Sequence, residues 1–501
     1  MDITAAQAAI RFGLGRTPGQ DPGSAPARWL AQQLAQADPG PAGAGVGEAF
    51  AALRQDQAAR RGLSQQGGMQ GGTQGGTQGG TQGGTQGQGQ GQGQGEGQGE
   101  RAPGRARQMF RDETRALLEH AVTTALPFRE RLVWFWFNHF TVSTRRGELA
   151  PLVGNYVREA IRPHVTGGFA DMLLAVMRHP AMLMYLDNGQ SAGPRSVAGL
   201  RQNRGLNENL ARECLELHTL SPASGYTQTD VTEFARVLTG WSVERQQAPS
   251  GFRFRPALHD PGEKSVLGRR FPEGEEGGVQ ALAWLAEHPA THRHLASKLV
   301  RHFVADAPPA DAVRRVEGVL RDTRGNLGAA ALEVTRLPGA WQPLAKIRCP
   351  QDFIVAAMRA AMPASGRASG RASGRASGRA SGRASGRASG RASELPGTLP
   401  EGGQPDLQGL IGGLGQPVFA APFPIGWPDT ASDWAGPEAL LRRVDWAYGF
   451  AARPELPEPM ELADAALGPL LSVATATEIR RAGSRRDGIT IVLASPEFQR
   501  R

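Results

Sequence analysis

One segment, Leu132–Phe140, constrains the fold more than any other part of the chain. Its sequence, LVWFWFNHF, is apolar on every face of a helix. A helix of this kind is buried on all sides, so it belongs at the centre of a large helical assembly. With 501 residues, the chain is long enough for two or three ordinary domains, or for one large core with insertions.

Amphipathic periodicity predicts helices along most of the remaining chain. Before residue 340 they are expected at Asp2–Phe12, Pro26–Ala35, Gly45–Arg61, Arg105–His120, Pro127–Phe140, Leu149–Arg162, Gly168–Arg178, Glu208–Leu220, Asp230–Leu238, Gly278–Glu287, Ala290–Val304, Asp311–Asp322 and Leu327–Leu337. Later helices are expected at Glu438–Ala452, Met460–Val473 and Thr477–Arg485. Thr227 and Asp230 have the spacing of a capping box, and the alternating stretch Gly251–Arg255 predicts a short strand. The predicted fold is all-α, a multi-helix orthogonal array with at most a short β-hairpin.

Two low-complexity tracts interrupt this pattern. Residues Gly67–Glu100 are almost entirely Gly, Gln and Thr, and Arg367–Gly390 consists of six consecutive copies of Arg-Ala-Ser-Gly. Neither tract has the apolar side chains that build a core, so both are expected to be disordered inserts in surface loops. The chain then divides into an N-terminal helical part (1–66), a Gly/Gln/Thr-rich insert (67–104), a helical core (105–363), an Arg-Ala-Ser-Gly linker (364–396) and a C-terminal helical part that packs on the core (397–501).

Much of the net charge of +9 comes from these tracts. The arginine tract, extended to Ser393, carries seven arginines and the glycine-rich tract carries Glu96 and Glu100, so the rest of the chain has a charge of +4. No aromatic side chains are interleaved with the basic run. A solvated linker explains this charge, and no specific binding of nucleic acid is expected.

Cysteine usage and the N-terminal segment favour a cytoplasmic protein. Cys214 and Cys349 are the only cysteines and lie in no Cys-x-x-Cys spacing, so both are expected to be reduced thiols of the core. The first residues lack the basic and apolar regions of a secretory signal. No stretch approaches the roughly 18–20 apolar residues that cross a bilayer.

The predicted helix at residues 207–220 carries the densest set of polar side chains. At 100° per residue, one arc of this helix holds Glu208, Asn209, Arg212, Glu213 and Glu216. Two carboxylates in this geometry can bind a hard cation or share a proton in acid–base catalysis. The alternative is an ordinary solvated face, with Glu208–Arg212 and Arg212–Glu216 as ion pairs four residues apart.

Two histidines extend this candidate site. His218 lies on the apolar arc of the same helix, and His139 ends the apolar helix beside Asn138. A bond to a backbone carbonyl for His218, and a core or capping role for His139, are the simplest interpretations. If both side chains point toward Glu213 or Glu216, they make a metal or acid–base site.

A polar turn after the predicted strand offers further groups. Asp260 and Lys264 in the sequence His259–Lys264 can hold an anionic substrate group, or Asp260 can simply pin the turn. The spacing His288-x3-His292-x-His294 resembles a metal motif. Pro289 and the basic residues that follow favour a helix entry and a solvated helix face there instead.

Two other loops carry polar or aromatic side chains. Asp187 and Asn188 end an apolar helix and serve either as caps or as ligands. Trp427 and Trp434, with Asp429 between them, form either an aromatic lid or a packing plug. No Walker loop, Gly-x-Gly-x-x-Gly, His-Glu-x-x-His or Gly-x-Ser-x-Gly motif is present, so nucleotide binding and the common hydrolase mechanisms lack support.

Several motifs resemble the bacterial family known as domain of unknown function 1800. They are Trp136–Phe140 (WFNHF), His179–Asn188 (HPAMLMYLDN), Leu206–Leu220 (LNENLARECLELHTL), Gly225–Val231 (GYTQTDV), Leu238–Trp241 (LTGW), Phe252–Phe254 (FRF), His259–Lys264 (HDPGEK), His288–Thr291 (HPAT), Gly415–Pro417 (GQP), Gly426–Asp429 (GWPD) and Ala494–Phe498 (ASPEF). The resemblance covers nearly everything outside the two tracts and implies a helical fold of unestablished activity. It also implies relatives that are often exported and encoded beside a sulfatase-like protein. This chain departs from that pattern because no signal peptide is seen.

Together these features predict an uncharacterised helical protein with one polar pocket, built by the 207–220 helix, the Asn138–His139 helix end and the 259–264 loop. If the pocket is catalytic, the predicted protein is a metal-assisted hydrolase with a divalent cation as cofactor. The predicted catalytic residues are Glu213, Glu216, His218 and Lys264, and the predicted metal ligands are His139, Glu213 and Glu216. The predicted binding residues are Asn138, Asp187, Asn188, Asn207, Glu208, Asn209, Arg212, His259, Asp260, Trp427 and Asp429. The alternative is a non-catalytic interaction or maturation partner of a neighbouring enzyme, such as the sulfatase-like protein.

Overall fold

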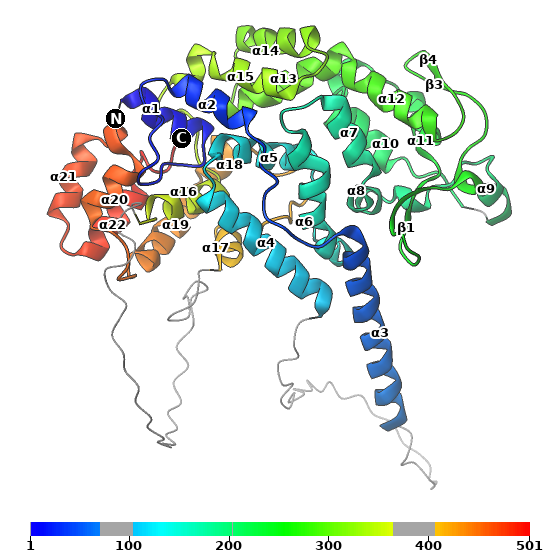
Figure 1. The fold of residues 1–501 in the computed structure, drawn as a ribbon, viewed down its shortest axis with the longest axis horizontal. Coiled ribbons are helices and arrows are strands. Elements are labelled where there is room, and N and C mark those ends of the chain that lie inside the picture. The colour runs from blue at the N-terminus through cyan, green and yellow to red at the C-terminus, as the bar shows by residue number, and fades with distance from the viewer. Residues whose placement is uncertain (1, 71–103, 203, 364–405) are drawn as a thin grey trace, which may run out of the picture.

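The apolar segment lies at the centre of the protein, as its composition predicts. In a computed structural model, which describes residues 2–70, 104–202, 204–363 and 406–501, it forms α5 (Pro127–His139). Every side chain of α5 except those of Trp134 and Asn138 is buried. Figure 1 shows α5 surrounded by helices from the N-terminal, middle and C-terminal parts of the chain. The central position predicted for this helix is confirmed.

Helices account for most of the structure before the strands. They are α1 (Ile3–Gln7), η1 (Ala8–Phe12), α2 (Pro26–Ala35), α3 (Val46–Gln70), α4 (Arg105–Thr123), α5, η2 (Gly147–Leu152), α6 (Val153–Tyr156), η3 (Val157–Ile161), η4 (Arg162–His164), α7 (Phe169–Arg178), α8 (Pro180–Tyr185), η5 (Asn188–Gln190), α9 (Val197–Gln202), α10 (Asn209–Glu213), η6 (Cys214–His218), η7 (Pro222–Ser224) and α11 (Gln228–Leu238). The capping box predicted for α11 is present, because Thr227 and Asp230 each bond to the other's backbone N–H.

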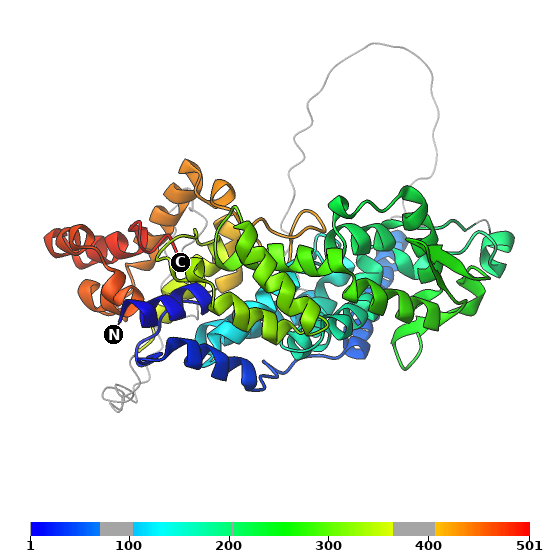
Figure 2. The same ribbon diagram turned by 90° about the horizontal axis from the view of Figure 1, so that it is seen from above.

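The second half of the described chain is also helical. It contains η8 (Pro256–Leu258), α12 (Glu275–Glu287), α13 (Pro289–Phe303), α14 (Ala310–Asp322), α15 (Leu327–Thr335), η9 (Pro338–Trp341), α16 (Pro350–Ala360), α17 (Leu407–Gly413), α18 (Ala431–Trp434), α19 (Pro437–Phe450), α20 (Pro459–Ala466), η10 (Gly468–Leu470), α21 (Val473–Arg481) and α22 (Arg485–Ala494). Seen from above, α13 to α15 run along the middle of an elongated body (Figure 2). The mainly helical fold class is confirmed.

Two small antiparallel hairpins complete the described structure. Strand β1 (Trp241–Glu244) pairs with β2 (Gly251–Phe254), which is the strand predicted from the alternating pattern. Strand β3 (Lys264–Val266) pairs with β4 (Arg269–Phe271), which the sequence pattern missed. The turn of this second hairpin places Leu267 and Gly268 at positive φ. Turns of this kind usually carry Asn-Gly or Asp-Gly, because leucine rarely adopts a positive φ. Here the turn sequence is Leu-Gly, so the sequence gives no sign of a hairpin.

The C-terminal helices begin and end at positions that the periodicity did not show. The predicted helix Met460–Val473 ends earlier, at Ala466, because Gly468 has a φ of +53° and a 3₁₀ turn follows. A new helix begins after Ser484, whose side chain accepts a hydrogen bond from the Asp487 backbone N–H. The predicted last helix, Thr477–Arg485, therefore stops at Arg481, and α22 takes its place at the C-terminal end.

One cluster of buried hydrophobic side chains joins the three helical parts. It includes Phe12 near the N-terminus, Trp136 of α5 and Phe498 near the C-terminus. The predicted inserts at 67–104 and 364–396 lie almost wholly outside the described residues. Within the described residues, no helix is both long and apolar enough to cross a membrane.

Candidate functional site

One face of α13 brings together three basic side chains. The helix begins after His288, whose ring accepts a hydrogen bond from the Ala290 backbone N–H, with proline in the first turn. His294, Lys298 and His302 follow at intervals of four residues and therefore lie on the same face. Each of the three is partly buried. Because α5, η6 and the loop before α18 meet this face, four separate segments of the chain build one polar site.

The end of η6 is held by two imidazoles. His294 Nε2 lies 3.0 Å from the Leu217 carbonyl oxygen, and His139 Nε2 lies 3.1 Å from that of His218. A carbonyl oxygen only accepts, so Nε2 carries the proton in both rings. These bonds satisfy carbonyl groups that a helix end leaves unpaired. The Nδ1 atom of His139 is then a buried lone-pair acceptor without a partner among the described residues.

His218 is fully buried and lacks hydrogen bonds. Neither ring nitrogen of His218 has a partner in the described part of the chain. Its ring centroid lies 5.8 Å from that of His139. Burial, with a smaller contribution from the charge of Lys298, lowers the pKa of His218 to about 3. The sequence suggested that the His218 ring bonds to a backbone carbonyl, but it does not. Instead, the backbone carbonyl of His218 accepts a hydrogen bond from the His139 ring.

Lys298 lies at the electrostatic centre of this site. It has no hydrogen bond and no ion pair with any described residue, and its charge acts on the pKa values of His139, His218 and His294. Burial lowers the pKa of Lys298 to about 8, with a further contribution from Arg301. Lys298 is only partly buried, and its Nζ is not among the fully buried atoms that lack a partner. Its ammonium therefore has no fixed counterion among the described residues and lies beside imidazoles that are neutral at pH 7.

His302 and Asp429 form a hydrogen-bonded dyad beside Lys298. His302 Nδ1 lies 2.5 Å from Asp429 Oδ2, and the carboxylate only accepts, so Nδ1 carries the proton. The other nitrogen, Nε2, is buried and has no partner in the described chain. Burial lowers the pKa of His302 to about 4, although Asp429 acts in the opposite direction. His302 is thus neutral near pH 7, with an available lone pair on Nε2.

Asp429 is held in place by two further cations. Arg501 Nη2 lies 3.3 Å from Asp429 Oδ1, and Lys346 Nζ donates to the Asp429 backbone carbonyl at 2.6 Å. Burial would raise the pKa of Asp429, but His302, Arg501 and Lys346 together keep it below its ordinary value. The carboxylate therefore remains ionised and fixes the orientation of His302. We call His139, His218, His294, Lys298, His302 and Asp429 the α13 cluster.

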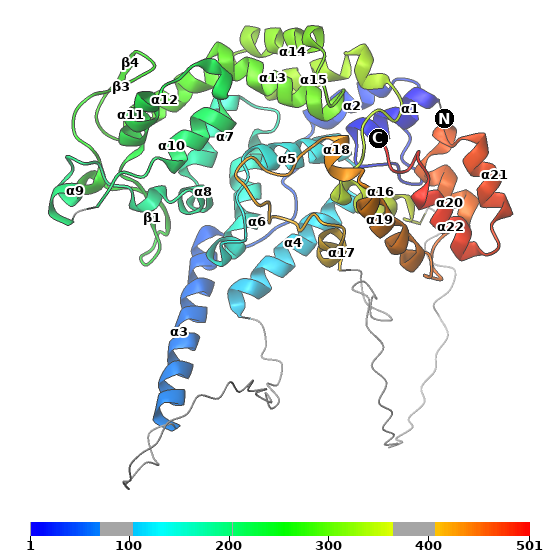
Figure 3. The same ribbon diagram turned by 180° about the vertical axis from the view of Figure 1, so that it is seen from behind.

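A tight contact with α5 places the Gly426–Asp429 segment in the cluster. Asn138 Nδ2 donates to the Trp427 carbonyl at 2.9 Å, and the Trp427 backbone N–H donates to Asn138 Oδ1 at 2.8 Å. Figure 3 shows the loop between α17 and α18 running past α5. The Trp434 indole N–H donates to the Pro428 carbonyl at 2.8 Å. Asn138 and Trp427 thus anchor the loop, while Asp429 supplies the functional group.

Replacing Gly426 with alanine is expected to loosen this loop. Gly426 has a φ of +84°, and an added Cβ would lie 2.4 Å from the Asn138 carbonyl oxygen. We expect the free energy of unfolding to fall by more than about 1 kcal/mol, measured by urea denaturation. The matched control is Gly449→Ala in α19, where a Cβ meets nothing within 4 Å and stability should be unchanged or higher. Equal stability of the two variants would contradict the anchoring role of the loop.

The predicted acidic pair is not joined to the histidines. Glu213 and Glu216 are partly buried, and burial together with Glu216 raises the pKa of Glu213. In the described chain, the one group of three or more His, Cys, Asp or Glu donors within 4.8 Å of one another does not include Glu213, Glu216 or His139. The predicted metal set is therefore not assembled. One reason is that residues 214–218 form a π-helix, which alters the angular positions that a regular α-helix would give.

Other predicted residues of this helix serve its folding. The Glu208 carboxylate accepts hydrogen bonds from Arg212 at 2.9 Å and from Thr232 of α11 at 2.7 Å. The Asn207 side chain accepts one from the Asn209 backbone N–H at 2.9 Å, at the start of α10. The Glu208–Arg212 ion pair predicted for a solvated face is thus present, and the hydrogen bond from Thr232 ties Glu208 to α11.

The 259–264 loop is pinned by its own contacts. Asp260 is buried and forms ion pairs with Arg195 at 2.9 Å and Arg236 at 2.6 Å. Lys264 Nζ lies 3.1 Å from His259 Nε2, and burial lowers the pKa of Lys264 to about 8. All side-chain hydrogen bonds of these three predicted residues stay within residues 195–274 of the described chain. The loop is therefore not joined to the α13 cluster.

The remaining predicted residues hold local structure. Asp187 has a φ of +58° and accepts two hydrogen bonds from Arg146, at 2.6 and 2.8 Å. The buried Asn188 side chain donates to the carbonyls of Leu238 and Trp241. A groove of about 490 Å³ lies between the start of α3 and the α7–α8 junction, and none of the predicted site residues lines it.

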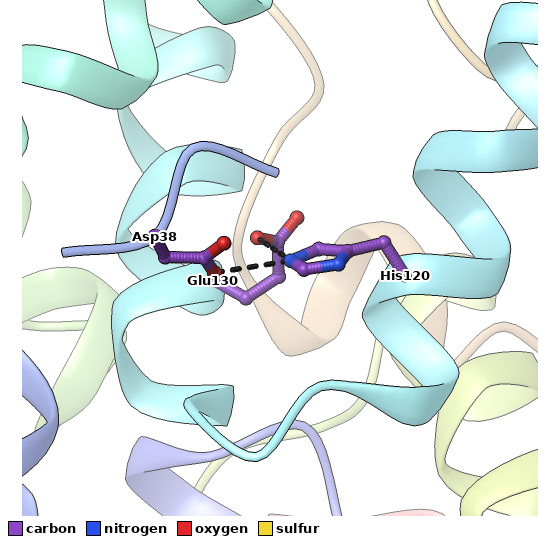
Figure 4. Close-up of side chains that lie close together, drawn as sticks. All are labelled: Asp38, His120 and Glu130. Atoms are coloured by element: carbon purple, nitrogen blue, oxygen red, sulfur yellow. Dashed lines mark hydrogen bonds and ion pairs between the residues drawn. The ribbon is translucent and has the colours of Figure 1, made fainter. Parts of the chain in front are cut away.

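A second polar cluster was not predicted from the sequence. Asp38, His120 and Glu130 offer donor atoms within 4.8 Å of one another, the distance range of a metal site (Figure 4). His120 Nε2 lies 3.0 Å from Asp38 Oδ2 and 3.5 Å from Glu130 Oε2. These side chains come from the loop after α2, from α4 and from α5, so no sequence spacing links them.

A fourth member, Arg162, already neutralises this cluster. Its guanidinium contacts Glu130 at 2.6 and 3.0 Å and Asp38 at 3.5 Å. The hydrogen bond to Asp38 is the largest of the effects that raise the pKa of His120 to about 9. At neutral pH, two carboxylates therefore face one imidazolium and one guanidinium. A metal ion would have to displace the proton of His120 and share both carboxylates with Arg162.

The structure is that of a mainly helical protein with a polar cluster along one face of α13. In a comparison with protein families, residues 7–500 match the family described as "Protein of unknown function (DUF1800)". The match spans nearly the whole chain, so the protein belongs to this family, as its motifs predicted. No curated protein and no solved structure matches the chain.

Proposed function

We propose that the protein is a hydrolase-type enzyme and that the α13 cluster is its acid–base site. The observation that carries the proposal is the asymmetry of His302. Its Nδ1 proton is held by an ionised carboxylate, while its Nε2 lone pair is buried without a partner in the described chain. This is the arrangement in which an imidazole removes a proton from a nucleophile while a carboxylate stabilises the resulting imidazolium.

The proposed reaction is hydrolysis of an acyl ester or amide by an activated water molecule. His302 Nε2 removes a proton from water as its oxygen attacks the carbonyl carbon, and the carbonyl oxygen becomes an oxyanion. Lys298 lies one helical turn from His302 and stabilises that negative charge. The imidazolium then returns its proton to the leaving oxygen or nitrogen as the acyl bond breaks, which releases an acid and an alcohol or amine.

These roles replace those predicted for the acidic pair. Glu213, Glu216 and Lys264 are not joined to the α13 cluster, so the base is assigned to His302 and the electrostatic role to Lys298. Among the predicted residues, His139, His218 and Asp429 belong to the cluster, and Asn138 and Trp427 position it.

A panel of nitrophenyl esters and anilides with acyl groups of different length tests the proposal. We expect the purified full-length chain to hydrolyse at least one member, and His302→Gln to reduce hydrolysis to the uncatalysed rate. The matched control is His164→Gln, which removes an imidazole outside the cluster and should leave the rate unchanged. Hydrolysis that survives in His302→Gln would contradict the proposal, and so would its absence throughout the panel. Ligand binding without turnover would favour the non-catalytic alternative.

A further inference from the structure

The surface groove between the start of α3 and the α7–α8 junction shares no lining residue with the α13 cluster. Its volume of about 490 Å³ lies within the range of about 300–1,000 Å³ that is usual for ligand sites. Residues from the start of α3, from η3, from the α7–α8 junction and from β2 line this one space together. Figure 1 shows the hairpin that contains β1 beside α8 and close to the first turn of α3.

The outer edge of β2 presents backbone groups without partners. The Arg255 N–H donates to the Gly240 carbonyl at 2.7 Å, and bonded and non-bonded residue pairs alternate along an antiparallel ladder. Phe252 therefore belongs to a non-bonded pair, so its N–H and C=O point away from β1, and no other described residue bonds to them. Phe252 lines the groove, and so does Gly251, which has only backbone atoms to offer. An unpaired strand edge thus lies at the groove.

A carboxylate with a buried support lies in the same groove. Asn155 is 1 % exposed, and its amide nitrogen donates to Glu159 Oε1 at 2.6 Å. The Asn155 oxygen lies 2.8 Å from His179 Nε2, while His179 Nδ1 accepts the Ala181 backbone N–H, so the ring proton is on Nε2. Burial lowers the pKa of His179 to about 3, so this ring is neutral. The relay holds the Glu159 side chain at the groove.

The cations close to Glu159 are already paired. Arg178, which also lines the groove, forms an ion pair with Glu275. Arg158 precedes Glu159 in the chain but pairs with Glu113 at 3.1 Å. An acidic residue in the first turn of α3 opposes the positive end of that helix. Among the described residues that line the groove, Glu159 is the charged side chain without a counterion, and it favours a cationic group.

The remaining lining consists mainly of small or apolar residues, which include Val46, Gly47, Ala160, Ala175 and Pro180. A strand added to β2 turns every second side chain toward one face, and small apolar side chains suit this lining. We propose that the groove binds an extended peptide segment of a partner protein, which pairs with the β2 edge at Phe252 and places a lysine or arginine at Glu159. This role is separate from the proposed hydrolase function and does not depend on it.

Fluorescence anisotropy with the full chain tests the proposal. The probes are blocked, fluorescein-labelled pentapeptides with arginine at the centre and alanine, valine or leucine at the other positions, and the same set with glutamine at the centre. The arginine peptides should bind about two- to fivefold more tightly than their glutamine counterparts, as expected for a solvent-accessible ion pair. Glu159→Gln should remove this preference. Glu461→Gln, which makes the same change at an exposed carboxylate of α20, should keep it.

Pairing with the strand is tested separately. Two further sets of arginine peptides are N-methylated at odd or at even positions, so they keep their side chains but lose alternate N–H donors. One of these sets should bind at least about threefold more weakly, because it lacks the hydrogen bonds to β2. The unmethylated peptide should also slow amide hydrogen exchange in residues 251–254. The proposal is overturned if no arginine peptide binds, if Glu159→Gln keeps the preference for arginine, or if neither methylated set binds more weakly.

Discussion

Replacing Glu130 with alanine is expected to lower the free energy of unfolding by about 3–5 kcal/mol, because it leaves a buried guanidinium without its main partner. Glu130 is fully buried, and Arg162 contacts both of its oxygens while being only 1 % exposed. Burial would raise the pKa of Glu130, but His120 and Arg162 hold it below its ordinary value. Denaturant unfolding, followed by tryptophan fluorescence, measures the effect.

The control for this experiment is an ion pair of the same length at the surface. Glu438 and Arg442 of α19 lie 2.6 Å apart but are 80 % and 52 % exposed, so Glu438→Ala should cost less than about 1 kcal/mol. Similar losses in the two variants would contradict the buried-pair explanation. Metal analysis of the wild-type protein adds an independent check. A stoichiometric divalent ion that disappears in His120→Ala would show that the cluster holds a metal in place of the proton.

The same cluster sets a pH window for stability. The pKa of His120 is raised to about 9 in the folded state, so its contribution is fully present below about pH 6.5 and is lost as the pH rises through about 9. Burial raises the pKa of Asp38, but the hydrogen bonds from His120 and the Gly40 backbone and the charges of His120 and Arg162 together lower it to about 2. The Asp38 contribution is therefore present above about pH 4 and is lost as the pH falls toward 2. The cluster should stabilise the fold most between these limits.

The elements of the fold were largely predictable because their signals are local. The apolar run of α5, the Thr227–Asp230 capping box and the alternating strand at residue 251 each depend on neighbours within a few residues. The second hairpin was not predictable, since its turn uses Leu267 at positive φ. The boundary between α21 and α22 depends on the cap at Ser484, which periodicity alone does not reveal.

The site was predictable only in part. Asp429, His139 and His218 were singled out, but their partner is α13, where the relevant signal is the four-residue spacing of His294, Lys298 and His302. That spacing places three basic groups on one helix face. A basic helix face is usually solvated, so the spacing alone does not predict a site. The sequence around α13 does not show that the face with His294, Lys298 and His302 is partly buried. It also does not show that residues 139, 218 and 429 contact this face. The π-helix at 214–218 was also beyond prediction from periodicity, because it breaks the 100° rule on which the acidic arc was drawn.

Asp429→Asn is expected to lower kcat/KM for the best ester substrate by about 10²–10⁴-fold. An amide in place of the carboxylate can bond to His302 Nδ1 but does not stabilise the imidazolium that forms when Nε2 takes a proton. The matched control is Asp445→Asn, which makes the same change at an exposed carboxylate of α19 and should leave kcat/KM unchanged. A rate that survives intact in Asp429→Asn would remove the dyad from the mechanism.

The pH dependence of kcat/KM gives the sharpest signature of the two assigned groups. His302 must be neutral to accept a proton, and its pKa of about 4 predicts that activity rises as the pH increases through that value. Lys298 must be charged to stabilise the oxyanion, and its pKa of about 8 predicts that activity falls above it. The profile should therefore be bell-shaped between about pH 4 and pH 8. In Lys298→Met the alkaline limb should disappear while the acid limb remains, whereas an unchanged alkaline limb would assign it to another group.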